Sequence, residues 1–182
     1  LELACAYAAF GTRITVVEAM DHMLPMLDGD LTAVGVAHMK KMGIGFALEC
    51  PVQSVEPSPV GAKVVCTTRS GDTVTFEAEK VLVAIGRKAN TASLDLEAGG
   101  IRNDRGRILV NNRMETNVPG VYAIGDCVFG KAQLAHTASA MGEVAAENIM
   151  GHSSTYDEKT NPPCVYMEPE AASVGLTEEQ CK

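Results

Sequence analysis

The chain has 182 residues, of which 46% are hydrophobic, so it is long enough to bury one or two modest cores. Fifteen basic residues against 23 acidic ones give a net charge of −8, which argues against a nucleic-acid or anionic-membrane surface. No apolar span of about 18 residues and no signal-peptide pattern is present, so the sequence predicts a soluble protein.

The N-terminal residues predict a helix and then a strand that ends in an acid. Residues 1–10 have a helical pattern that stops at Gly11, and a strand follows from Arg13 to Glu18. This order is the second half of a dinucleotide-binding βαβ unit, in which the terminal carboxylate accepts hydrogen bonds from the adenosine ribose. Glu18 is therefore a candidate ribose ligand.

A second helix is predicted after a loop over residues 19–29. Asp30 is expected to cap this helix, and Gly43 to end it. Its apolar face is predicted at spacings of three and four residues, with His38 half buried as a packing residue rather than a metal ligand: Leu31, Val34, His38 and Met42.

The next residues predict a parallel strand followed by antiparallel ones. Ile44 to Glu49 has a strand pattern, and the runs 62–68 and 73–77 flank a hairpin-type turn at 69–72. A more apolar run from Lys80 to Ile85 is predicted to return to the parallel sheet and to end at Gly86 and Arg87. The fold class is thus α/β, a Rossmann-like parallel sheet with an antiparallel β-meander insert.

A second candidate site follows a turn at Pro119 and Gly120. Residues 108–110 and 121–124 are predicted strands, and the latter is expected to be buried and to end in Gly125 and Asp126. A carboxylate at the carboxyl end of a strand can accept two hydroxyl hydrogen bonds, as a ribose or polyol requires. The helix predicted over 133–150 would turn free N–H groups toward it, although an ordinary strand-loop-helix connection has the same pattern.

The last residues predict a linker over 151–163 and a helix start at Thr177, where Gln180 completes a capping box. Both ends of the chain therefore fall within predicted elements, which indicates a piece of a longer protein. The six cysteines include no closely spaced pair, so we expect free thiols, no metal site and a reducing, cytoplasmic location.

Residues 116–126, together with Gln133, Leu134, Ala135 and His136, resemble the second flavin-binding motif of the pyridine nucleotide-disulfide oxidoreductases. The Leu-Ala-His element is similar to that of the members that oxidise dihydrolipoamide. The resemblance implies that Gly125 and Asp126 bind the ribityl or ribose side of FAD, and that the backbone of residues 133–136 faces the pyrimidine edge of the flavin.

The resemblance also implies a set of NAD contacts. Leu1 and Glu2 match the last two places of the family's G-x-G-x-x-G-x-E motif, and Glu2 would lie where the nicotinamide approaches the flavin. By the same resemblance Val52 lies near the adenine and Gly86 near the nicotinamide half, and Arg87 is a further cofactor-binding residue. The sequence departs from the family at Ala89, where proline is usual.

The implied domains are an NAD-binding domain over 1–92, a FAD-binding segment over 93–156 and the start of a dimerisation domain over 157–182. The parent would be a homodimer that oxidises dihydrolipoamide or a lipoyl domain through FAD to NAD. The redox cysteine pair and the His-Glu pair of the family are absent here, so we expect these 182 residues alone to be inactive. The alternatives are a mercuric, glutathione or coenzyme A disulfide reductase, and a non-catalytic nucleotide-binding module.

Overall fold

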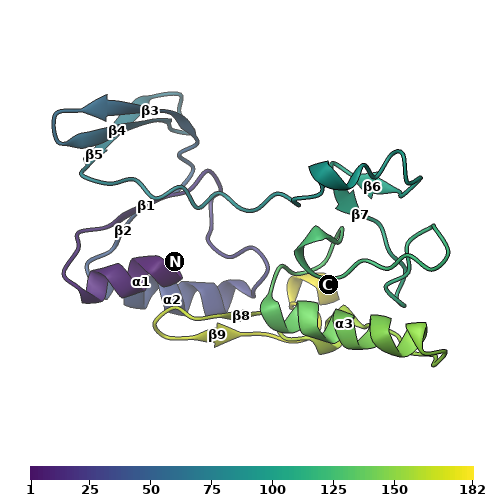
Figure 1. Cartoon of the computed structure of the whole chain (residues 1–182). Helices are drawn as coiled ribbons and strands as arrows, with labels where there is room; N and C mark the ends of the chain where they lie inside the picture. The colour runs from purple at the N-terminus through teal and green to yellow at the C-terminus, as the bar shows by residue number, and fades with distance from the viewer. The chain divides into compact units, whose positions relative to one another are not determined.

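A computed structural model describes residues 1–182 and has a mixed α/β fold with parallel and antiparallel sheets, as predicted (Figure 1). Contacts divide the chain into two compact units. Unit 1 contains Leu1–Ala84 and Cys164–Lys182, and unit 2 contains Ile85–Pro163. The domain limits at residues 92 and 156 stay predictions. No helix has the length and apolarity needed to cross a membrane.

Unit 1 begins with the predicted helix-strand pair. Helix α1 (Glu2–Ala9) is followed by Phe10 and then Gly11, whose φ of +84° is the left-handed conformation expected just after a helix. Strand β1 (Thr15–Val17) then pairs in parallel with β2 (Gly45–Ala47), in a register that runs from Thr15 opposite Gly45 to Val17 opposite Ala47. The carboxyl ends of both strands therefore lie at the same sheet edge.

Helix α2 (Gly29–Lys41) connects these strands, and the predictions of its cap and its buried face were wrong. Asp28 precedes the helix without a side-chain cap, and its Oδ1 instead accepts a hydrogen bond of 2.8 Å from the Glu178 N–H. The buried residues are Thr32, Gly35 and Met39, one position along from the predicted face. Of that face, Met42 does pack partly against the core. Met167 packs directly against Gly35, so closely that a Cβ on residue 35 would overlap the Met167 side chain. His38 is exposed.

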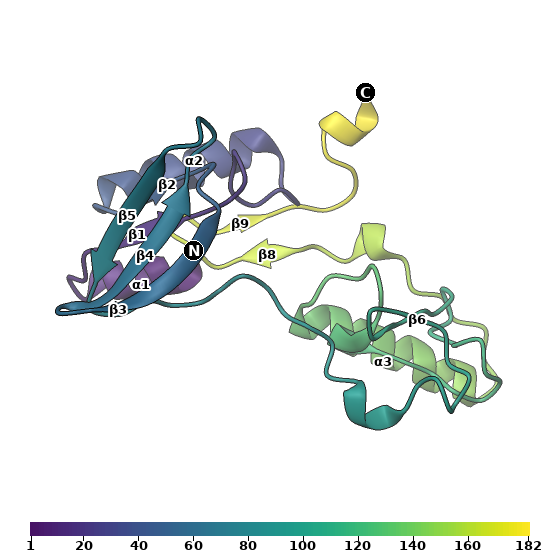
Figure 2. The same cartoon turned by 90° about the horizontal axis from the view of Figure 1, so that it is seen from above.

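The β-meander is a three-stranded antiparallel sheet in the order β3 (Val52–Ser58), β4 (Gly61–Thr67), β5 (Thr73–Ala78), seen in Figure 2. The sequence did not predict β3, since Pro57 interrupts a run in which polar residues dominate. The predicted strand over Lys80–Ile85 was also wrong. These residues form no ladder, and Leu82, Val83 and Ile85 are 62%, 68% and 93% exposed, because no neighbouring strand offers them hydrogen bonds.

The C-terminal residues complete unit 1. Strands β8 (Cys164–Val165) and β9 (Ala171–Ala172) form a short antiparallel pair, and the 3-10 turn η4 (Glu179–Cys181) ends the chain. Thr177 and Gln180 exchange the two predicted capping-box hydrogen bonds, at 3.0 and 3.2 Å. One core cluster joins this segment to α1 and α2 through four buried residues: Cys5, Met39, Ile44 and Met167.

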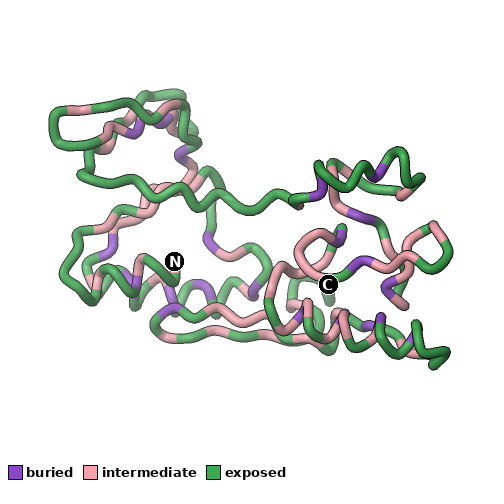
Figure 3. Tube along the Cα trace, viewed as in Figure 1, coloured by how far each residue is buried: buried purple, intermediate pink, exposed green.

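Unit 2 is built around α3 (Ala135–Ile149). A hairpin of β6 (Asn103–Asp104) and β7 (Arg107–Ile108) and the 3-10 turns η1 (Ala92–Leu94), η2 (Gly125–Cys127) and η3 (Glu158–Thr160) surround it. Its core includes Met114, Val128 and Met141, none of which is exposed to solvent, and Figure 3 shows such buried positions recurring along the trace.

The buried strand predicted over 121–124 was wrong, as was the strand predicted over 108–110. Tyr122 forms only an isolated bridge with Glu115, and Ile124 is 42% exposed. The short β7 ends at Ile108 because its partner β6 has only two residues.

Candidate cofactor-binding sites

The first candidate site is the edge where β1 and β2 end. Glu18 follows β1 directly, and its backbone continues the pairing: its N–H donates to the Ala47 carbonyl at 2.9 Å and its carbonyl accepts from the Cys50 N–H at 2.9 Å. One carboxylate oxygen accepts from the Met20 N–H at 2.9 Å. The second oxygen can accept from a ligand hydroxyl, so the geometry fits the predicted ribose contact.

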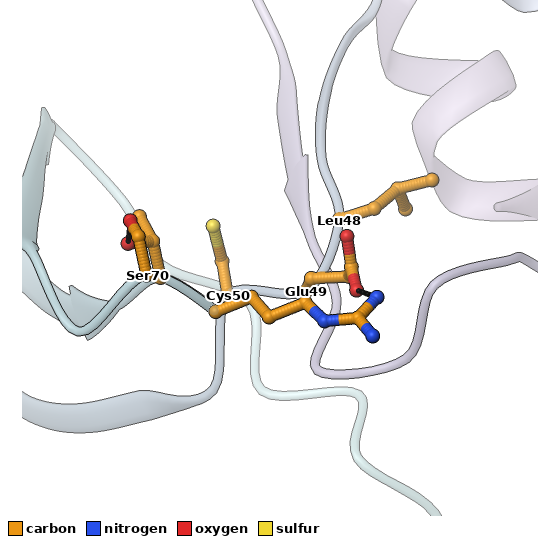
Figure 4. A pocket seen from close by; sticks show the side chains of 6 residues that line it. Leu48, Glu49, Cys50 and Ser70 are labelled. Atoms are coloured by element: carbon orange, nitrogen blue, oxygen red, sulfur yellow. Dashed lines mark hydrogen bonds and ion pairs between the residues drawn. The ribbon is translucent and has the colours of Figure 1, made fainter.

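An open depression lies beside this edge, where the loops after β1 and β2 meet the turn between β4 and β5. Two adjoining hollows share Glu49, Thr68 and Arg69. In Figure 4 the side chains of Leu48, Glu49, Cys50 and Ser70 surround the first, and the dashed line marks an ion pair of 2.7 Å between Arg69 Nη1 and Glu49 Oε1.

The second hollow brings in one further carboxylate. Asp21 lines it, and a hydrogen bond and the charge of His22, with a smaller contribution from Arg69, hold the pKa of Asp21 below its usual value. Pro51 and Gln53 line the same hollow. Val52, which lies between them, begins β3 and is 47% exposed. The predicted adenine contact is thus next to an actual depression.

Leu1 and Glu2 stand at the start of α1, and neither lines the depression. Leu1 occupies the N-cap position and packs partly against the core cluster of Cys5 and Met39. Glu2 Oε1 accepts a hydrogen bond of 2.7 Å from the Tyr166 N–H. The predicted position of Glu2 at the nicotinamide stays a prediction.

The second candidate site lies in unit 2, around Asp126. Asp126 belongs to η2 rather than to the end of a strand. Its Oδ2 forms an ion pair of 3.1 Å with Arg87 Nη1, and the two side chains are 43% and 72% exposed. Gly86 is exposed and has a φ of +107°, a conformation that favours glycine. The structure thus brings together Arg87, predicted to bind a cofactor, and Asp126, predicted to bind FAD.

Gly125 sets the position of Asp126 against α3. Its φ is +73°, and a Cβ there would lie 3.4 Å from the Ala138 Cβ. The Gly125 N–H points to the sulfur of the buried Met141 at 3.3 Å. The turn therefore packs on α3, and its positive φ would strain any other residue at position 125.

The N-terminus of α3 faces the same turn. Gln133 Nε2 donates to the Asp126 carbonyl at 3.2 Å, and His136 Nε2 donates to the Pro162 carbonyl at 2.8 Å. Leu134 is the N-cap residue and has no side-chain acceptor, and Ala135 begins the helix. The first-turn N–H groups therefore have no side-chain cap, and together with the helix dipole they favour an electronegative ligand.

These features fit a flavin nucleotide. The half-exposed Asp126 carboxylate can accept hydroxyl hydrogen bonds, and the uncapped start of α3 can donate to carbonyl or anionic oxygens. Asp126, Gln133, Leu134, Ala135 and His136 are thus brought together as the sequence predicts. Whether each of them contacts a cofactor stays a prediction.

Two features were not foreseen from the sequence. Arg69 and Glu49 are 20 residues apart and meet only because the meander folds back on its first strand. Cys50 and Cys66 are both buried in one cluster with Val64, and burial, with a smaller effect of Cys50, raises the pKa of the Cys66 thiol. The contact of Arg69 with Glu49 and that of Cys50 with Cys66 both depend on how the meander strands pair, and the sequence did not predict β3.

A family model and individual relatives both match this chain. The family model described as pyridine nucleotide-disulphide oxidoreductase matches residues 1–142. The chain is 40% identical to a dihydrolipoyl dehydrogenase of Geobacillus stearothermophilus and 41% identical to a mitochondrial one of Arabidopsis thaliana, in each case over 100% of its length. It spans 38% and 36% of these relatives, well under half of each.

Solved structures agree with the sequence comparison. LpdA from Mycobacterium tuberculosis superposes with a TM-score of 0.84 at 32% identity, over 97% of this chain and 38% of LpdA. The HOCl-induced flavoprotein disulfide reductase RclA from Escherichia coli gives 0.80 at 27% identity, over 98% of this chain and 40% of RclA. The fold, the order of motifs and these matches lead to one conclusion: the chain belongs to the pyridine nucleotide-disulphide oxidoreductase family.

Proposed function

We propose that this chain is the NAD-binding and part of the FAD-binding portion of a flavoenzyme that oxidises dihydrolipoamide, free or on a lipoyl domain, and reduces NAD. The proposal rests on one observation: Gln133 donates a hydrogen bond to the Asp126 carbonyl and so holds Asp126 beside the uncapped start of α3. Similarity to dihydrolipoyl dehydrogenases over the whole chain supports the substrate class.

The residues of the chain would bind and orient the cofactors. Asp126 would hold FAD hydroxyls, and the first turn of α3 would stabilise negative charge at the pyrimidine edge. Glu18 would hold the adenosine ribose of NAD at the β1 edge, with Val52 beside the adenine. Bound FAD would supply the transfer of two electrons from the dithiol to NAD. We further propose a cytoplasmic homodimer as the parent.

The test is Asp126→Ala in the full-length flavoprotein. Each hydrogen bond to a charged group contributes about 1.5 to 3 kcal/mol, so FAD retention should weaken about tenfold or more. Asp126→Asn should have a smaller effect because it keeps the side-chain shape. Flavin content after dialysis, measured by absorbance, gives the result independently of turnover.

Asp104→Ala is the matched control, since Asp104 is also paired with an arginine in unit 2 and is 42% exposed. Equal flavin content in the Asp126 and Asp104 variants would refute the assignment of Asp126. If the protein retains flavin but does not reduce NAD with dihydrolipoamide, it is instead a sister disulfide reductase. If the purified wild type contains no flavin at all, it is a non-catalytic nucleotide-binding module.

A further inference from the structure

The depression beside Glu18 contains an ion pair that bears on which nicotinamide cofactor can bind. We infer that Glu49, by occupying Arg69, is a specificity determinant that prevents the 2′-phosphate of NADP from binding at this edge. The inference rests on the proposed function, and it adds two residues to the cofactor contacts predicted above.

The position of the pair is fixed by three elements. Glu49 follows β2 at the edge where Glu18 follows β1. The Glu49 N–H donates to the Met20 carbonyl at 2.9 Å, so the loops after both strands are joined. Arg69 lies in the turn after β4, and the Thr67 N–H donates to the Pro51 carbonyl at 3.2 Å, which holds that turn against the start of β3. A ribose bound at Glu18 would thus lie close to this pair.

The charges around the depression are unbalanced. Arg69 is the one basic residue that lines either hollow, whereas Asp21 and Glu49 are both acidic. Arg69 Nη1 is already 2.7 Å from Glu49 Oε1. A 2′-phosphate, with a charge of roughly −1.5 to −2, would face Glu18, Asp21 and Glu49 and only one paired cation.

Removing the Glu49 charge alone should therefore release the cation. In Glu49→Gln the side-chain shape is kept, and Arg69 becomes free to pair with a phosphate. Both side chains are exposed, Arg69 at 82% and Glu49 at 40%, so solvent screens the interaction. We expect a gain in affinity of about fivefold for the phosphorylated ligand, which corresponds to about 1 kcal/mol.

The experiment measures binding of ADP-ribose and of 2′-phospho-ADP-ribose to the full-length flavoprotein by calorimetry. Glu49→Gln should bind 2′-phospho-ADP-ribose about fivefold more tightly, with ADP-ribose changed by less than about twofold. The gain should shrink at high salt, and Glu49→Gln combined with Arg69→Gln should abolish it. Glu77→Gln, an equal change of charge at an exposed position of β5, should give no such gain.

An equal gain in Glu77→Gln, or a gain that survives loss of Arg69, would overturn the inference, because the effect would then be one of net charge alone. If wild type binds ADP-ribose and Glu49→Gln shows no gain, the inference fails and the proposed function stands. If wild type binds neither ligand, the proposed NAD site fails and the inference fails with it.

Discussion

Glu18 is the residue from which we predict a preference between the two nicotinamide cofactors. One of its carboxylate oxygens is engaged by the Met20 N–H at 2.9 Å, which orients the group at the sheet edge. We expect the parent to favour NAD over NADP by at least about a hundredfold, since a ribose hydroxyl hydrogen bond to a charged group contributes about 1.5 to 3 kcal/mol and a phosphate would be repelled.

Glu18→Ala should remove most of that margin through a higher KM for NAD. The measurement is kcat/KM for NAD and NADP, with Glu77→Ala as the control for loss of a surface charge. An unchanged ratio in Glu18→Ala would mean that the carboxylate is only a solvated residue at the end of a strand.

Tyr156 predicts a dependence of stability on pH. Burial raises the pKa of its phenol, partly offset by the hydrogen bond from Asn161 at 3.2 Å. The folded state therefore favours the neutral phenol, and its contribution is complete below the ordinary pKa of 10.0 and is lost as the pH rises through the higher folded value.

Thermal unfolding of wild type and Tyr156→Phe between about pH 8 and 11 would test this, since phenylalanine does not ionise. The melting temperature of Tyr156→Phe should fall less steeply with pH. Tyr7→Phe, at a side chain that is 51% exposed, should follow wild type. Parallel curves for all three proteins would contradict the prediction.

Residues that act through local chemistry were predictable from the sequence, whereas those that act through register were not. Glu18 and Asp126 are predicted site residues because each acid ends an apolar run beside a glycine or a turn. The ion pair between Arg87 and Asp126 joins residues that are 39 positions apart, and it depends on the turn geometry of η2. Arg69 was assigned only to a hairpin turn.

Among the elements, the meander depends on two turn glycines that differ in their surroundings. A Cβ on Gly61, whose φ is +140°, would lie 2.5 Å from the Glu79 carbonyl oxygen and 2.6 Å from that of Ala78. Gly71 has a φ of +91° and would meet nothing within 4 Å. Both positions carry backbone strain when substituted, but only Gly61 adds a clash with backbone atoms.

Gly61→Ala should therefore lower the free energy of unfolding by about 1 to 3 kcal/mol more than Gly71→Ala. Urea unfolding of the two variants beside wild type measures the difference. Equal losses would show that β5 moves aside without cost, and that the close approach of its backbone does not constrain the turn.

Helices were easier to predict than strands in this chain. The ranges of α1 and α3 follow from glycine stops and apolar periodicity, which are local in sequence. The run from Lys80 to Ile85 has a strand composition but finds no ladder, and β3 has a poor composition but gains one from β4. Pairing with a neighbour, rather than propensity, decided both outcomes.

For the molecule as a whole, we predict that these 182 residues do not oxidise dithiols. The chemistry requires an accessible thiolate and a partner sulfur within reach. Cys50 and Cys66 share a cluster but are buried, and the raised pKa of Cys66 disfavours its thiolate. Formation of NADH from NAD and dihydrolipoamide by this chain alone would contradict the prediction, with full-length protein as the positive control.

The division of unit 1 into two chain segments has a consequence for the order of folding. Its Glu2 carboxylate and Tyr166 N–H are 164 positions apart, whereas unit 2 is continuous in sequence. Closing so long a loop has a large entropic cost and is therefore slow, so unit 2 should acquire its structure first. During synthesis on the ribosome, unit 1 can be completed only after residues 164–182 have emerged. In pulsed hydrogen exchange during refolding, the Ala145 amide of α3 should become protected before the Tyr166 amide, which donates to Glu2.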